Sequence, residues 1–192
     1  MSINLPQLHM RRDLDHLPEF AIPAGYALRP FTEDDAPVLA ALLVENAELG
    51  EWNLERASRY FAADSPCVLA SSFFVIRDEV AIATAQLDLH REDTYAPTPE
   101  LGWVAARPAH QGHGLGYVVC LAVMQHAAAL GHHEIFLRTD DHRLPAIRTY
   151  LKLGFRPWLY DETAAERWQK LAVVLNTTIA FLQRGPRIDY WP

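Results

Sequence analysis

Three glycines at alternate positions, Gly112, Gly114 and Gly116, separate a β-rich run from a long apolar stretch. The run Glu100 to Ala106 is typical of a strand, and Leu115 to Leu130 is typical of a helix that packs broadly on a sheet. Glycines allow the backbone to approach a ligand closely, and the first amides of a helix lack intrahelical acceptors. A tight turn alone would explain one such glycine rather than three. The segment therefore predicts a loop that holds a phosphate-bearing ligand.

The remaining patterns predict a mixed α/β chain in which strands and helices alternate. Predicted strands cover 26–31, 71–76, 80–89, 100–106 and 134–139, with the second and third forming an antiparallel hairpin. Predicted helices follow Thr32, span Asn53 to Phe61, span Leu115 to Leu130, begin near Pro145, and run from Thr163 through an apolar stripe that ends at Leu182. We expect an α/β (α+β) fold with a C-terminal amphipathic helix.

Length and composition indicate one domain of an ordinary globular protein. The chain has 192 residues, of which 50% are hydrophobic, and we expect an N-terminal arm over 1–22 and one domain over 23–192. A formal net charge of -7 gives no support to a nucleic-acid or membrane partner. Two distant cysteines and the lack of a signal sequence favour the cytoplasm. The histidine spacings match no metal motif, so we expect no metal.

The spacing of the glycines narrows the choice of phosphate ligand. A Walker loop requires Lys and then Ser or Thr at its end, whereas Tyr117 follows Gly116. A dinucleotide fingerprint requires Gly-x-Gly-x-x-Gly and a longer chain after it. Asp140, at the end of a predicted strand, is the feature that keeps the dinucleotide alternative open.

Two segments resemble the GNAT superfamily of acyl-CoA-dependent N-acyltransferases. Gln111-x-x-Gly114-x-Gly116 is similar to that family's Arg/Gln-x-x-Gly-x-Gly/Ala loop, and Ala146 to Phe155 is similar to its later Ala-x-x-x-Tyr-x-x-x-Gly-Phe segment. The likeness is sharpest over 100–157. It implies a GNAT-like mixed, mostly antiparallel sheet flanked by helices, with acetyl-CoA as co-substrate.

The resemblance also implies which residues bind the coenzyme. The glycine loop would hold the pyrophosphate, and the strand before it would pair with the pantetheine arm. One position departs from the family, because Arg143 stands where many relatives have Asn. The implied coenzyme-binding residues are Val104, Ala105, Ala106, Gln111, Gly112, His113, Gly114, Leu115, Gly116 and Arg143.

The implied reaction is direct attack of a primary amine on the thioester. A base is required because an alkyl amine has a pKa near 10.4. Glu100 matches the position of the family's base, and Tyr150 matches the tyrosine that protonates the leaving thiolate. The acceptor would be a small-molecule amine or a protein amino group. Acidic side chains would attract its positive charge, and two aromatic side chains would line its cleft: Glu45, Glu48, Glu51, Glu92 and Asp93, with Trp52 and Trp103. A non-catalytic acyl-CoA-binding sensor, suggested by Arg143, and assembly as a homodimer stay open.

Overall fold

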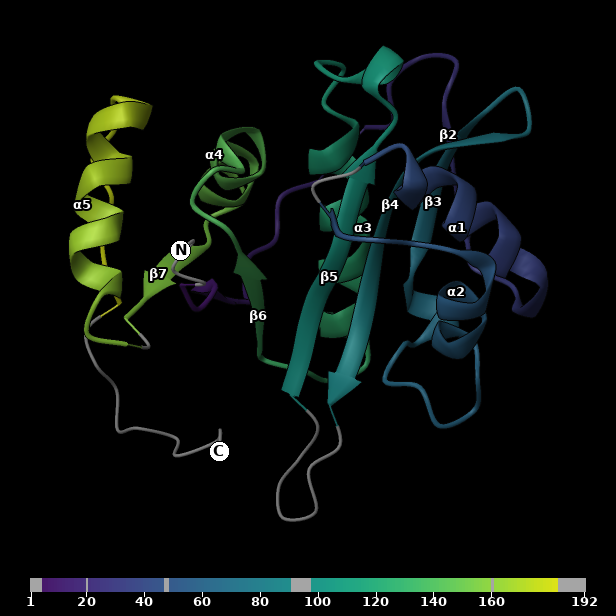
Figure 1. Cartoon of the computed structure of the whole chain (residues 1–192), viewed down its shortest axis with the longest axis horizontal. Helices are drawn as coiled ribbons and strands as arrows, with labels where there is room; N and C mark the ends of the chain where they lie inside the picture. Colours follow the sequence, from purple (N-terminus) through teal and green to yellow (C-terminus); the bar gives the residue numbers. More distant parts are fainter. Residues whose placement is uncertain (1–4, 20, 47–48, 91–97, 160, 183–192) are drawn as a thin grey trace. The chain divides into compact units, whose positions relative to one another are not determined.

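The chain folds into two compact units (Figure 1). A computed structural model describes residues 5–19, 21–46, 49–90, 98–159 and 161–182. The larger unit is Asp13–Ile135, and the smaller unit combines the chain up to Arg12 with the chain from Phe136 onward.

An antiparallel meander forms the sheet of the larger unit. Its strands are β2 (Ala27–Pro30), β3 (Phe73–Arg77), β4 (Val80–His90) and β5 (Thr98–Ala106), and they lie in that order. The predicted hairpin is confirmed. Its turn consists of Asp78 and Glu79, which have φ values of 49° and 62°, as a two-residue turn that follows the twist of the strands requires.

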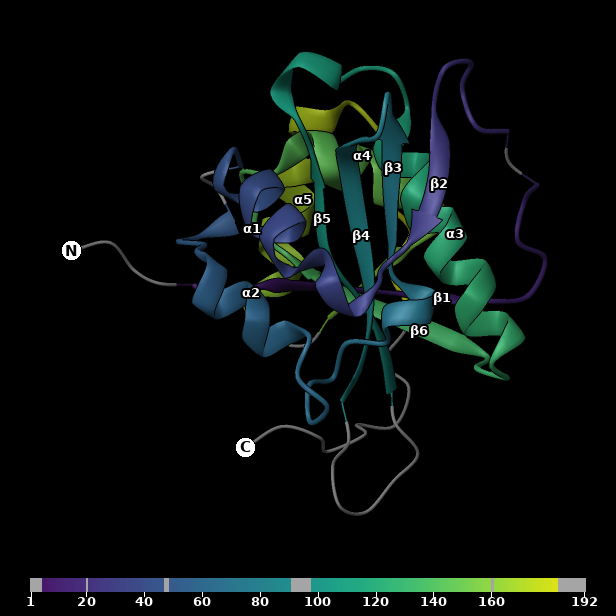
Figure 2. The same ribbon diagram turned by 90° about the vertical axis from the view of Figure 1, so that its right-hand side faces the viewer.

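Helices cover both faces of the meander (Figure 2). Helix α3 (Leu115–Ala129) lies on the face that carries Phe73, whose ring centroid is 4.7 Å from that of His126. Helices α1 (Ala36–Val44) and α2 (Leu54–Tyr60) lie on the other face, where Phe74 joins the core that α1 buries. Because successive strand residues point to opposite faces, the side chains of β4 alternate between the same two faces. Ala83, Ala85 and Leu87 share the α3 face, and Thr84, Gln86 and Asp88 share the α1 and α2 face.

A β-bulge interrupts the pairing of β4 with β5. Thr84 lies opposite Ala105, but two positions further along β4 Gln86 lies opposite Gly102. Two residues of β5, Trp103 and Val104, therefore face the single residue Ala85, and Trp103 takes a φ of 47°. A bulge of this kind leaves backbone groups of the bulged strand outside the ladder.

The smaller unit holds three neighbouring strands and two helices. The strands lie in the order β6 (Glu134–Thr139), β1 (Leu8–Asp13) and β7 (Arg156–Trp158), and β1 and β7 are antiparallel. Helices α4 (Leu144–Lys152) and α5 (Ala164–Leu175) complete it. Helices combined with mostly antiparallel strands confirm the predicted fold class.

The sequence patterns did not predict strands β1 and β7, and they placed the end of α5 too far along the chain. Strand β1 lies inside the segment expected to be an arm without regular structure, and it is stabilised by pairing with β7. Helix α5 ends at Leu175 instead of Leu182, because Asn176 adopts the left-handed conformation with a φ of 49°. Leu182 then pairs in parallel with Trp158. The boundary at residue 22 stays a prediction.

Candidate functional site

The glycine loop presents bare backbone at the start of α3. Gly112 and Gly114 have φ values of 82° and 75°, which L side chains rarely adopt, and Gly114 is the N-cap residue of α3. A Cβ atom added to Gly112, Gly114 or Gly116 would meet nothing within 4 Å. Within the described part of the chain, the amides from Gly112 to Gly116 donate to no protein acceptor. The loop therefore offers open space lined by free N–H groups, a geometry that suits a phosphate group.

Two histidines hold this loop in place. The Tyr26 hydroxyl and His110 Nδ1 are 3.0 Å apart, and His113 Nδ1 lies 3.2 Å from the His110 carbonyl oxygen and 3.1 Å from that of Gln111. Among the residues that the structure describes, no group of three His, Cys, Asp or Glu side chains is arranged to hold a metal ion. Both histidines thus have a structural partner.

The strand before the loop ends in the segment expected to bind the pantetheine arm. Val104 and Ala106 are half-buried and Ala105 is buried; Val104 is the second residue of the bulge, and the other two follow it. The next residue fixes the strand end, because Arg107 Nε donates to the Ala81 carbonyl at 2.7 Å and Arg107 also forms an ion pair with Glu45.

Glu100 lies on β5, directly opposite Asp88 on β4, and its residue is only 5% exposed. The Tyr60 side chain from α2 lies close enough to both carboxylates for their charges to act on it. Burial raises the pKa of Tyr60 above its ordinary value of 10.0, and the charges of Asp88 and Glu100 raise it further. The Tyr60 oxygen accepts a hydrogen bond from Trp103 Nε1 at 2.5 Å. Glu100 therefore belongs to a buried polar cluster.

An aromatic cluster flanks these carboxylates. The rings of Trp52 and Trp103 meet edge to face with centroids 4.6 Å apart, and Tyr60 contacts both. The Arg56 guanidinium lies 4.4 Å from the Trp52 ring centroid and 5.2 Å from that of Trp103. The two predicted wall residues thus contact each other.

Of the five acidic residues expected to attract the acceptor, Glu48, Glu92 and Asp93 lie outside the described residues.

The predicted acid, Tyr150, belongs to the smaller unit. It lies on α4, is 6% exposed and contacts Phe155 edge to face at 6.1 Å between ring centroids. Arg143, the N-cap residue of α4, forms an ion pair with Asp140 at 2.6 Å. Asp140 also accepts hydrogen bonds from the Gln7 amide at 3.3 Å. Asp140, the residue on which the dinucleotide alternative depended, is therefore bound by two side chains of its own unit.

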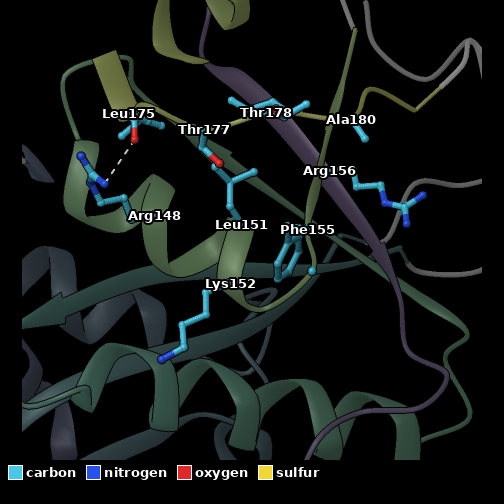
Figure 3. A pocket seen from close by; sticks show the side chains of 11 residues that line it. Arg148, Leu151, Lys152, Phe155, Arg156, Leu175, Thr177, Thr178 and Ala180 are labelled. Carbon is cyan, nitrogen blue, oxygen red and sulfur yellow. Dashed lines mark hydrogen bonds between the residues drawn. The ribbon is translucent and has the colours of Figure 1, made fainter. Parts of the chain in front are cut away.

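A pocket of about 530 Å³ lies in the smaller unit, where α4 faces the segment that follows α5 (Figure 3). Three of its lining residues, Arg148, Lys152 and Arg156, are basic. Arg148 donates to the Leu175 carbonyl at 3.4 Å, and Lys152 and Arg156 extend in different directions (Figure 3). None of the predicted site residues lines this pocket.

Sequence reasoning missed Tyr60, Gln86 and Asp88. Thr84, Gln86 and Asp88 alternate with apolar residues, a pattern that ordinarily marks a strand with one solvated face. In the structure that face is covered, and all three residues are buried. Only the packing of α1 and α2 shows that these polar groups are interior.

Comparison with known proteins gives consistent results. The model of the acetyltransferase (GNAT) domain matches residues 26–156. The chain is 32% identical over 161 residues to a mycothiol acetyltransferase of Nocardia farcinica, covering 77% of this chain and 52% of the relative. It is 31% identical over 169 residues to the mycothiol acetyltransferase of Mycobacteroides abscessus, covering 83% and 55%. The chain thus spans about half the length of these curated relatives.

A solved structure supports the fold. The structure of a GCN5-related N-acetyltransferase from Sphaerobacter thermophilus superimposes with a TM-score of 0.63 at 18% identity, covering 80% of this chain and 50% of that one. In the described residues, no helix combines the length and apolar character needed to cross a membrane.

Proposed function

Because this chain belongs to the GNAT acetyltransferase family, we propose that it transfers the acetyl group of acetyl-CoA to a primary amine by direct attack on the thioester. The observation that carries the proposal is the open glycine loop, whose free amides at the N-terminus of α3 suit a pyrophosphate. Gln111 to Gly116 would hold the pyrophosphate, and Val104 to Ala106 would pair with the pantetheine arm. Arg143 would contact the coenzyme only by exchanging or sharing its ion pair with Asp140.

Glu100 and Tyr150 divide the proton transfers in this proposal. Glu100 removes one proton from the ammonium group, so that the neutral nitrogen can attack the thioester carbonyl carbon. As the C–S bond breaks, Tyr150 donates its hydroxyl proton to the departing sulfur, and the second proton, which the nitrogen loses as the amide forms, returns through water to the Tyr150 phenolate. Burial of both side chains supports these roles, because a proton transfer is more effective where bulk water is excluded.

The acceptor is proposed to be a small molecule rather than a protein amino group. The curated relatives are named mycothiol acetyltransferase, and a name that refers to a small molecule favours an acceptor of that class. The free cysteines Cys67 and Cys120 are consistent with a reducing compartment, so the cytoplasm stays our prediction.

Release of free coenzyme thiol from acetyl-CoA, measured with a panel of primary amines, tests the proposal. We expect amine-dependent release that falls about 10²- to 10⁴-fold in Tyr150→Phe and in Glu100→Gln. Asp78→Asn is the matched control, because Asp78 lies exposed in the hairpin turn, where Asn also tolerates a positive φ. Saturable acetyl-CoA binding without release for any amine would instead favour the sensor.

A further inference from the structure

The α1 and α2 face of β4 carries three buried polar residues in succession. Thr84 and Gln86 are 0% exposed and Asp88 is 3% exposed, whereas the opposite face of the same strand carries alanine and leucine. A covered sheet face is ordinarily apolar, because burying a polar group without a partner costs free energy. We refer to Thr84, Gln86 and Asp88 as the β4 polar stripe.

Part of this stripe has no protein partner. Within the described part of the chain, neither the amide nitrogen nor the amide oxygen of Gln86 makes a hydrogen bond, and the Thr84 hydroxyl makes none. The large majority of buried side-chain polar atoms in proteins do have a partner. A fully buried amide with both ends unsatisfied therefore points to a group that the protein itself does not supply.

Two carboxylates and a glycine adjoin the Gln86 amide. Asp88 lies opposite Glu100, and Gln86 lies opposite Gly102, so all four positions adjoin on one face. A Cβ atom at Gly102 would come within 3.0 Å of Asp88 Oδ2. The Asp88 carboxylate thus leans over Gly102, toward the position that faces Gln86.

The surroundings suit a cationic guest. Both carboxylates act on Tyr60, whose pKa burial raises most, so their negative field extends to this residue of α2. Ring faces of Trp52 and Trp103 already attract the Arg56 guanidinium. An ammonium group would gain from the same two carboxylates.

We infer that the β4 polar stripe binds the acceptor, with Asp88 holding its ammonium group and the Gln86 amide holding a hydroxyl or amide of the same molecule. The inference rests on the proposed acetyl transfer. Residues two apart on a strand are separated by about 7 Å, and the Asp88 carboxylate leans toward Gln86, so the two groups of the acceptor need a shorter separation than this. Asp88 positions the ammonium while Glu100 takes its proton. The preferred substrates are therefore cationic amines with a hydrogen-bonding group, rather than plain alkylamines.

Two probe amines, 3-aminopropanamide and butylamine, test this assignment. In Gln86→Leu we expect the ratio of kcat/KM for 3-aminopropanamide to kcat/KM for butylamine to fall about tenfold, because only the former has a group for the amide. In Asp88→Asn we expect KM for both amines to rise about tenfold with kcat changed less than threefold, the pattern of lost ground-state binding.

Two further variants keep the test specific. Gly102→Ala should reproduce the Asp88→Asn effect, because its Cβ would displace the Asp88 carboxylate. Asp78→Asn should change neither KM nor the ratio. The affinity for acetyl-CoA should stay within twofold of wild type in Gln86→Leu and Asp88→Asn.

The outcomes distinguish failure of this inference from failure of the proposed acetyl transfer. Wild-type turnover of both amines, with the ratio and KM unchanged in the variants, overturns the inference and leaves acetyl transfer standing; water alone then satisfies Gln86. A loss of acetyl-CoA affinity parallel to the rise in KM also overturns it, since strand packing would then be the cause. The absence of turnover by the wild type with any amine in the panel would overturn the proposed function and the inference together.

Discussion

Two glycines at opposite ends of α3 allow the coenzyme loop to be tested with a matched control in the same helix. Gly114 precedes the helix with a φ of 75°, and Gly131 follows it with a φ of 89°. A Cβ atom at either position would meet nothing within 4 Å. Replacing each with alanine therefore imposes nearly the same backbone strain without a steric clash.

The expected cost to stability is small and equal. A non-glycine residue in the left-handed region costs about 1–2 kcal/mol, and the stiffer unfolded chain returns roughly half of that. The net loss of about 1 kcal/mol corresponds to a fall in Tm of about 2–4 °C in a chain of this size. Gly114→Ala and Gly131→Ala should lie together within this interval.

The expected cost to coenzyme binding is unequal. A methyl group at Gly114 projects into the open space over the free amides, where phosphate oxygens would lie. Loss of one hydrogen bond to a charged oxygen, worth about 1.5–3 kcal/mol, lowers affinity at least tenfold. Gly131 lies at the other end of the helix, so Gly131→Ala should bind acetyl-CoA as the wild type does.

Isothermal titration with acetyl-CoA and thermal unfolding of the two variants measure both quantities. An affinity reduced at least tenfold in Gly114→Ala alone, with matched falls in Tm, supports the loop as the pyrophosphate site. Equal affinities in the two variants would refute the reasoning, because free amides under open space would then have no role in binding.

Further predictions concern stability and reactivity. Gly116→Ala should raise stability by up to about 1 kcal/mol with acetyl-CoA binding retained, since Gly116 is helical and the family loop admits Ala there; thermal unfolding and titration check this. Asp35→Asn should lose about 2 kcal/mol at neutral pH, measured by urea unfolding, because Arg29 binds that carboxylate at 2.7 and 2.8 Å. Burial opposes ionisation, but the bonds from Arg29 and Thr32 outweigh it and hold the pKa of Asp35 below its ordinary 3.8, so the stability difference should persist above pH 3.8 and vanish as the pH falls through the lower folded-state value. Half-buried Cys67 and buried Cys120 should react slowly with a disulfide reagent at pH 8 in the native protein, because loss of contact with water raises the pKa of Cys67 to about 12 and that of Cys120 further; rapid reaction would contradict these pKa shifts.

Local signals in the sequence were sufficient for several elements. Thr32 and Asp35 have the spacing of a capping box in the sequence, and the box forms, with Asp35 accepting from the Thr32 amide at 2.7 Å. Thr163 and Glu166 have a similar spacing, but no box forms at α5, and Asp161 accepts the hydrogen bonds from Thr163 and Ala164 instead. Several short polar residues in one loop compete for the same amides, so the sequence pattern alone could not select the partner.

By itself, the sequence determined the hairpin, the glycine loop and the helix that follows it, because turn residues, left-handed glycines and helix periodicity act between neighbours along the chain. The tertiary structure decided that residues 8–13 form a strand, that α5 stops at Leu175, and that Gln86 and Asp88 are buried beside Glu100. Each of these depends on a segment distant in sequence. Strand pairing and the exclusion of water from a sheet face arise only when such segments meet, and no local pattern specifies which ones will.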